Sequence, residues 1–225
     1  MKLKYGIITL MATFLFTLTA QAQNVFNEVS YSPRQTTFKL NAPKKPTLRI
    51  YEAGRGGNAI KKIKMKQTAE NVWEATVSGD LKGKFYTFDI GRGETPGVFA
   101  KAVGINGHRG AIIDMQTTNP SGWNSDHRLA LKSPADLIIY EMHHRDFSID
   151  PSSGLVNKGK FLALTEQKAI RHLKELGINA VHILPSFDFA SIDEANTTTP
   201  QYNWGYDPQN YNVPEGSYSF DAEQP

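Results

Sequence analysis

The sequence predicts two parts of different fold class, an all-β sandwich followed by the opening of a parallel α/β sheet. The first prediction rests on short segments of alternating polarity, rich in β-branched and aromatic residues and separated by Gly and Pro, in residues 24–125. The second rests on a strand, helix, strand pattern in residues 126–225, where two short apolar runs flank an amphipathic segment. The change of pattern places a domain boundary near residue 125.

Four segments of the first part have strand character. In the last of them, Phe85 and Thr87 alternate with Tyr86 and Phe88, so one face of this strand is clearly apolar. An apolar face needs a second layer to cover it, which favours two packed sheets. The predicted strands span residues 36–40, 47–52, 72–77 and 84–90.

Two features of the first part suggest binding surfaces, but packing explains them better. The lysine-rich run 61–66 alternates charges with apolar residues, which is typical of an edge strand protected against mispairing rather than of a nucleic-acid site. Trp73 and Trp123 offer flat rings to a sugar, yet burial in a core or a domain interface is the commoner outcome for tryptophan. We predict a lysine-bearing edge and packed tryptophans, and leave sugar stacking open.

The second part reads as a βα unit followed by a parallel strand. An apolar run at 137–140 gives way to the polar string 141–146, as when a buried strand opens onto a site at its carboxyl end. Apolar residues at helical spacing fill 166–176 and Gly177 ends the segment. A second apolar run at 180–184 stops at Pro185. This order begins a parallel sheet or a (β/α)8 barrel.

Several strings of the sequence resemble those of one enzyme family. The string YNWGYDP at 202–208 resembles the motif by which type I pullulanases of the α-amylase superfamily, glycoside hydrolase family 13, are told from their relatives. The resemblance covers roughly residues 38–219. Further matching strings are IYEMHHRDFS at 139–148, NKGK at 157–160, HLKELG at 172–177, LPSFDFAS at 184–191 and NYNVPEGSY at 210–218, with 80–84 and 101–110 in the first part.

The resemblance implies an architecture and a reaction. It implies an immunoglobulin-like β-sandwich domain over 24–125 and the truncated start of a (β/α)8 TIM barrel over 126–225. The implied enzyme hydrolyses α-1,6-glucosidic branch linkages in pullulan, starch, glycogen or their limit dextrins, and it retains configuration by using two carboxyl groups about 5 to 5.5 Å apart. In the family these groups follow the fourth and fifth barrel strands, whereas this sequence offers two strands. We therefore expect no catalytic residue here and no activity of the chain alone; a non-catalytic α-glucan-binding protein is the alternative.

The same resemblance assigns substrate-binding roles to the 202–208 string. Tyr206 corresponds to the aromatic ring that stacks under the glucose just before the scissile bond, and Asp207 to a carboxylate that reaches hydroxyls or an arginine of that subsite. Asn203 and Trp204 are expected to shape the wall, with loop packing as the other interpretation of Trp204. Gly205 allows the close turn that brings Tyr206 into place.

A pair of histidines stands beside this expected site. His143 fits the family pattern and is expected to contribute to substrate binding, whereas His144 stands where the family has an aliphatic residue. Neighbours on a strand point to opposite faces, so the two cannot easily share an ion, and we expect one to face the barrel mouth and the other to pack outward. We expect no metal and no cofactor in this chain, with structural calcium an option for the full-length enzyme. A branched α-glucan is the expected partner; a formal charge of +3 does not favour nucleic acid.

The first 22 residues predict export. Lys2 and Lys4 precede the apolar stretch 7–20, and Ala20, Gln21 and Ala22 form the small-x-small pattern at which signal peptidase cleaves. The apolar run of about 14 residues is shorter than the roughly 20 needed to span a bilayer, so no stable membrane anchor is expected. We expect cleavage after Ala22 and a periplasmic or extracellular location. The sequence has no cysteine, so disulfides and thiolate metal sites are excluded.

Overall fold

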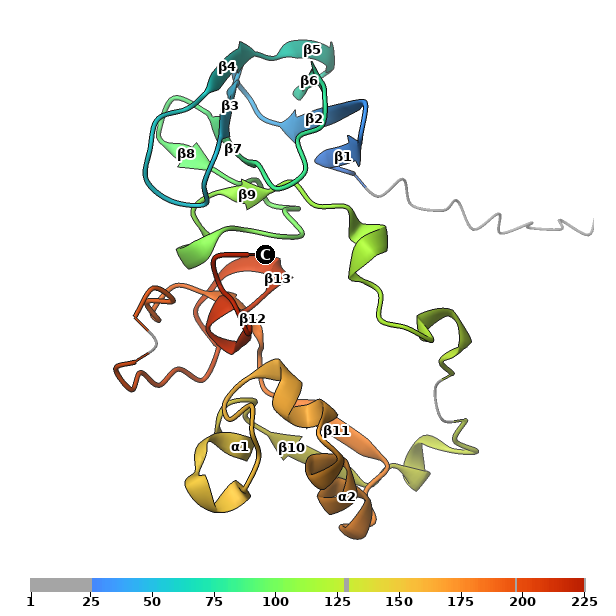
Figure 1. Cartoon of the computed structure of the whole chain (residues 1–225). Coiled ribbons are helices and arrows are strands. Elements are labelled where there is room, and N and C mark those ends of the chain that lie inside the picture. The colour runs from blue at the N-terminus through green and yellow to red at the C-terminus, as the bar shows by residue number, and fades with distance from the viewer. Residues whose placement is uncertain (1–25, 128–129, 197, 225) are drawn as a thin grey trace, which may run out of the picture.

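The computed structural model describes residues 26–127, 130–196 and 198–224. The predicted signal segment 1–22 lies outside these residues. No helix in the described ranges is long and apolar enough to cross a membrane. The chain forms a β-sandwich, an extended connecting segment and a smaller α/β unit (Figure 1). A short β element lies between the sandwich and the α/β unit.

Two antiparallel sheets make up the sandwich. The order of strands is β1-β2-β6-β5 in one sheet and β4-β3-β7-β8 in the other, where β9 also pairs with β7. Between β4 and β5 the chain crosses from the edge of one sheet to the edge of the other through Met65, which is fully buried. The strands are β1 (Val29–Ser32), β2 (Gln35–Asn41), β3 (Thr47–Tyr51), β4 (Lys61–Lys64), β5 (Lys66–Ala69), β6 (Val72–Ser78), β7 (Phe85–Asp89), β8 (Glu94–Thr95) and β9 (Gly110–Ala111).

The core lies between the two sheets and is filled by alternate residues of the strands. Phe38 on β2, Leu48 on β3 and Phe88 on β7 are completely buried there. The Tyr86 ring lies 5.2 Å from the Phe38 ring and 5.4 Å from the Phe88 ring, in tilted and edge-on contacts. The predicted apolar face of this strand is therefore confirmed. Its other face is covered as well, because Phe85 belongs to a second buried cluster.

The lysine-rich run lies on sheet edges, as predicted. β4 and β5 each pair with one strand only, and their lysines are exposed. Trp73 packs against the core and its Nε1–H donates to the carbonyl of Ala42 at 2.9 Å, so its packing is confirmed. The packing predicted for Trp123 is wrong, since this side chain is 57% exposed. It lies in a short 3-10 turn of the connecting segment, which no strand or helix of the described chain covers.

The strand, helix, strand prediction is confirmed in the α/β unit. β10 (Ile139–Met142) pairs in parallel with β11 (Ala180–Ile183), and α2 (Gln167–Glu175) lies between them in the sequence. The first strand begins two residues later than predicted. A capping box between Ser133 and Asp136 forms a 3-10 turn over Pro134–Asp136 that ends at Leu137 and delays the strand.

One β element was not predicted. β12 (Phe187–Phe189) and β13 (Pro208–Pro214) pair antiparallel and lie between the sandwich and the β10–α2–β11 unit (Figure 1). β12 has only three residues and β13 has proline at both ends, so neither has a strong strand signal. Two short helical segments also contribute to this region. The helix α1 (Asp146–Ile149) follows β10, and the 3-10 turn η7 (Gly216–Tyr218) follows β13.

The sandwich core yields a stability prediction. Phe88→Ala is expected to lower the free energy of unfolding by about 3 to 5 kcal/mol, because it removes a fully buried ring and leaves a cavity between two sheets. Urea unfolding followed by tryptophan fluorescence measures it. Val98→Ala is the control: Val98 is 77% exposed, so a change below about 0.5 kcal/mol is expected. A Phe88→Ala loss as small as that of the control would contradict the packing described.

Candidate functional site

The side chain of one asparagine fixes the loop that carries the YNWGYDP string. Asn203 donates through Nδ2 to Asp207 Oδ1 at 2.7 Å and also to Ser191 Oγ, and its Oδ1 accepts the backbone N–H of Gly205 at 2.6 Å. Ser191 Oγ in turn donates to Asp207 Oδ2 at 2.6 Å. The amide therefore closes the turn 203–205 and fixes the carboxylate that follows it.

Gly205 is required at the tip of this turn. Its φ is +86°, a left-handed conformation that side chains rarely adopt, and a Cβ there would collide with the backbone carbonyl of Pro185. The close turn predicted for Gly205 is confirmed. The turn leaves Trp204 and Tyr206 with 62% and 66% of their surface exposed. Two flat aromatic rings thus lie open to solvent on a backbone that is pinned by hydrogen bonds.

Asp207 is ionised under ordinary conditions. The hydrogen bond from Ser191 is the main cause that holds its pKa below the usual range, and the one from Asn203 adds to it. Each carboxylate oxygen accepts one of these bonds, which leaves lone pairs free for a further donor such as a sugar hydroxyl.

His143 anchors the same loop from the α/β unit. Its Nδ1 accepts the backbone N–H of Asp146 at 3.3 Å, which assigns the ring proton to Nε2. Nε2 lies 2.7 Å from the carbonyl of Asn203 and 3.2 Å from the hydroxyl of Tyr218. The ring also lies in tilted contact with the Tyr202 ring, with 5.3 Å between the ring centroids. One hydrogen-bond network therefore contains His143, Asn203 and Asp207. It fixes the loop on which Trp204 and Tyr206 lie exposed.

His144 behaves differently from its neighbour, though not as expected. β10 ends at Met142, so the two histidines do not share a strand, and both approach the Tyr218 ring. His144 is 4% exposed and lies edge-on to Phe161 at 4.6 Å, and which of the two histidines faces the barrel mouth stays a prediction. Among the described residues neither ring nitrogen has a partner within hydrogen-bond geometry, although the Lys160 backbone lies close enough to favour the charged form; burial is the larger effect and lowers the pKa of His144. It is a neutral ring packed among aromatic rings.

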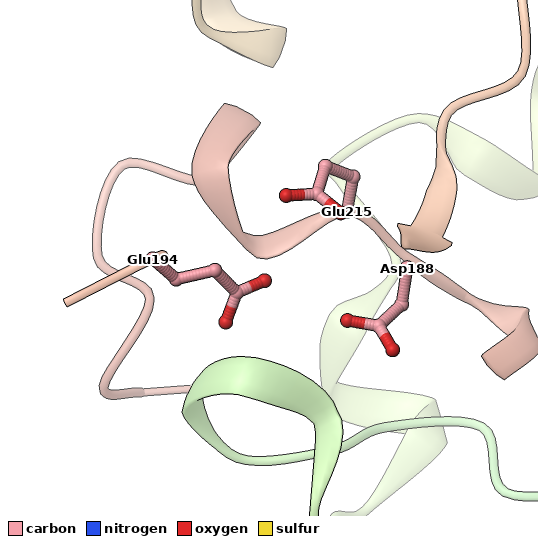
Figure 2. Close-up of side chains that lie close together, drawn as sticks. All are labelled: Asp188, Glu194 and Glu215. Carbon is pink, nitrogen blue, oxygen red and sulfur yellow. The ribbon is translucent and has the colours of Figure 1, made fainter. Parts of the chain in front are cut away.

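A second group of polar residues lies close by and was not recognised as a group in the sequence. The carboxyl groups of Asp188, Glu194 and Glu215 approach one another, with one oxygen of each within 4.8 Å of the others (Figure 2). All three are buried, with Glu215 fully inaccessible. They come from β12, from the segment after it and from the residue that follows β13, so no sequence spacing links them.

Each carboxyl group of this cluster accepts hydrogen bonds from the chain. Glu215 accepts the backbone N–H of Phe189 at 3.0 Å and that of Ser217 at 2.9 Å. Burial raises its pKa to about 7 in spite of these bonds, and the nearby charge of Glu194 adds to the rise. Burial likewise raises the pKa of Asp188 to about 6 and raises that of Glu194.

The cluster is a structural feature rather than a reaction centre. Carboxyl groups at this spacing are ligands that a hard cation accepts, but both oxygens of Glu194 and of Glu215 already accept backbone N–H groups. We assign no metal to them. A glycosidic bond cannot reach carboxyl groups that are 0% to 6% exposed, so the cluster does not supply the catalytic pair either.

The network under the loop makes a testable prediction. Ser191→Ala is expected to raise the pKa of Asp207 toward its ordinary value, because the hydroxyl is the main donor to that carboxylate, while Asn203 keeps part of the depression. Carbon-detected NMR titration of the side-chain carboxyl groups measures the change. Ser78→Ala, on the exposed end of β6, is the control and should leave Asp207 unchanged. An unaltered Asp207 titration in Ser191→Ala would refute the network.

Comparison with known proteins places this geometry in a family. No family model matches the chain. A pullulanase of Bacillus subtilis (strain 168) is 35% identical over 208 residues, which cover 87% of this chain and 28% of the relative. The crystal structure of pullulanase from Paenibacillus barengoltzii, in complex with maltohexaose and alpha-cyclodextrin, matches with a TM-score of 0.83 at 43% identity and covers 88% of this chain and 33% of that chain. Pullulanase from Bacillus acidopullulyticus matches with a TM-score of 0.78 at 40% identity over 87% of this chain and 26% of that one.

These matches extend over both the sandwich and the segments that hold the loop, because they cover close to nine-tenths of the chain. The chain spans about a third or less of the length of these relatives. Identities of 35% to 43% over so long a match, with the fold retained, mark common descent. Over close to nine-tenths of its length the chain is homologous to pullulanases, and it corresponds to one part of them.

Proposed function

We propose that this chain is part of an enzyme that cleaves α-1,6 branch linkages of α-glucans, and that it supplies substrate-binding surface rather than the reacting carboxyl groups. The main supporting observation is that Tyr206 and Trp204 are exposed on a loop whose backbone is fixed by Asn203. The chain that carries this loop is homologous to pullulanases. Rings held open by a rigid backbone suit the apolar faces of sugars, since little freedom is lost when they bind.

The geometry supports the role proposed for each residue. Tyr206 presents a flat ring on which a glucose residue stacks, and Trp204 forms a second aromatic wall. Asp207 is ionised and keeps free lone pairs, so it accepts hydrogen bonds from sugar hydroxyls. Asn203 and His143 hold the loop in place from below. A relative crystallised with maltohexaose and alpha-cyclodextrin supports an α-glucan as the ligand.

The α/β unit is proposed to be the opening of a (β/α)8 barrel over 126–225, after an immunoglobulin-like domain over 24–125. Its two strands are parallel and joined through a helix, as in such barrels. Apolar side chains remain open on these strands and beside them: Ile139 is 58% exposed, Val181 40% and Ile183 36%. Parallel strands are normally covered on both faces, so these side chains indicate contacts with barrel elements that the described residues do not provide.

The reaction of the intact enzyme is proposed to be retaining double displacement. One carboxylate attacks the anomeric carbon and a second carboxyl group protonates the leaving oxygen, at a separation of about 5 to 5.5 Å. Asp207 is engaged with Ser191 and Asn203, and the cluster around Glu215 is buried, so neither fills these roles. We further propose export through cleavage after Ala22, and structural calcium as an option of the full-length enzyme only.

The proposal predicts that the 225-residue chain alone does not release reducing ends from pullulan above the level of a buffer blank. The reason is that the reacting carboxyl groups of the resembled family follow the fourth and fifth barrel strands, whereas the described residues form only the two parallel strands β10 and β11. A reducing-end assay measures it, with the pullulanase of Bacillus subtilis as the positive control. Turnover that persists through repurification and follows the chain would show that the reacting groups lie within it; binding of glucan without turnover in every longer form would favour the non-catalytic alternative.

A second prediction concerns Tyr206 in a longer, active form of this protein. Tyr206→Ala is expected to lower both kcat and kcat/KM by about ten- to a few hundred-fold, since loss of a stacking contact that strengthens in the transition state removes roughly 1.5 to 3 kcal/mol. Tyr206→Phe should retain most activity, because the ring and not the hydroxyl makes the contact.

Steady-state kinetics on pullulan, with thermal melts to verify folding, measures these effects. Trp123→Ala is the matched control, as Trp123 is an aromatic residue of similar exposure that lies outside the loop. A folded Tyr206→Ala enzyme with wild-type kcat would remove Tyr206 from the site.

A further inference from the structure

The buried carboxyl cluster lies where the sandwich meets the β12–β13 element. The sandwich contributes the turn Ile105–Gly107, and its Asn106 pairs reciprocally with Glu194. The backbone N–H of Asn106 donates to Glu194 Oε2 at 2.5 Å, and the backbone N–H of Glu194 donates to Asn106 Oδ1 at 2.8 Å. Asn106 Nδ2 also donates to Asp193 Oδ1 at 3.0 Å. One asparagine of the sandwich is thus bound by three hydrogen bonds to the segment that follows β12.

The same turn is bound by β13. Gln209 donates to the carbonyl of Asn106 at 2.9 Å and Asn210 donates to the carbonyl of Gly107 at 3.1 Å. Asn210 Nδ2 also donates to Asp188 Oδ2 at 2.6 Å, which connects the turn to the cluster. Gly107 has a φ of +70°, and a Cβ there would collide with Asp188 and its neighbours. The polar contacts at this junction are therefore closely packed, and they meet at the three carboxyl groups.

The cluster lacks a positive partner. No ion pair between described residues includes Asp188, Glu194 or Glu215. The charges that face it are more distant and of both signs. They are His108 from the sandwich, Asp193 from the same segment as Glu194, and Lys160 from the side of the α/β unit. Arg55 of the sandwich faces Asp193, and the neutral hydroxyl of Tyr218 faces Glu215.

Three buried carboxylates so close together repel one another and lose hydration, and hydrogen bonds offset only part of this loss. A proton is the smallest species that removes the charge. Glu194 and Glu215 line a cavity of about 300 Å³ between the sandwich and the β13 end, which offers protons a route from solvent.

We propose that Asp188, Glu194 and Glu215 form a proton-operated latch between the sandwich and the β12–β13 element. When the cluster holds protons, the latch is closed and the turn Ile105–Gly107 is fixed against β13. When it ionises, repulsion between the carboxylates separates the segments that carry them. The junction then loosens while the sandwich core, which contains none of these groups, stays folded.

The direction of the pH dependence follows from the raised pKa values. Folded-state pKa values of about 7 for Glu215 and about 6 for Asp188 lie above their ordinary values of 4.5 and 3.8. Raised carboxyl pKa values mean that the folded junction binds more protons than the open one, so its stability is fully present at low pH and is lost as the pH rises through 6 and 7.

Hydrogen–deuterium exchange of the chain at pH 5.5 and pH 8.0, corrected for intrinsic exchange, tests the latch. Protection of the amides of residues 106, 194 and 216–217 is expected to fall at least about tenfold between the two pH values, and that of β7 to stay constant. Glu215→Gln should flatten the dependence, because it removes one titrating group at the centre. Asp188→Asn is the second variant, so the test stands if the first does not fold. Glu70→Gln, an exposed carboxyl on the sandwich, is the matched control and should behave like wild type.

Two results would overturn the latch. The first is wild-type protection at the junction that does not change, or rises, between pH 5.5 and pH 8.0. The second is recovery of protection at pH 8.0 on addition of calcium chloride, reversed by a chelator, since a cation and not a proton would then neutralise the cluster.

Discussion

Glu215 joins two segments of backbone that are distant in the sequence. Its oxygens accept the N–H groups of Phe189 on β12 and of Ser217 on η7, so one side chain ties together both ends of the stretch between them. That stretch contains Ser191, Asn203 and the exposed aromatic residues of the loop. Without this tie, the internal hydrogen bonds of the loop would fix its shape but not its place. The position of the candidate sugar site therefore depends on a carboxyl group that no sugar can reach.

The strength of this tie is limited by the cost of burying charge. A hydrogen bond to an ionised group contributes about 1.5 to 3 kcal/mol, whereas desolvation of a carboxylate costs several kcal/mol. For Glu215 the desolvation is the larger effect, which is why its pKa is raised to about 7 in spite of its bonds to two backbone groups. Asp207 shows the opposite balance: it is near the surface and accepts two hydrogen bonds, so its pKa is lowered. The two carboxyl groups flank β13, one before it and one after it, and their pKa values are shifted in opposite directions.

Local pattern was enough to predict the elements whose packing repeats along the chain. Alternation identified β7 and its apolar face, and helical spacing identified α2 within one residue at each end. The 202–208 string indicated Asn203 and Asp207, and the 139–148 string indicated His143. These three residues form one network in the structure. The roles assigned to Tyr206 and Trp204 remain predictions, although their exposure agrees with them. The carboxyl cluster could not be predicted, because its members are brought together by a strand pair with little strand signal. The packing predicted for Trp123 is wrong because the exposure of a side chain depends on which other parts of the chain cover it.

Between the sandwich and the α/β unit, residues 114–127 and 130–138 form short turns with little burial. Such a connection keeps the two bodies within reach of each other, at an effective concentration on the order of millimolar. An interface joined in this way needs only weak intrinsic affinity to be occupied most of the time. Its opening is then a reversible, unimolecular event that does not depend on how much protein is present, and the two bodies can separate and rejoin many times without being lost to each other.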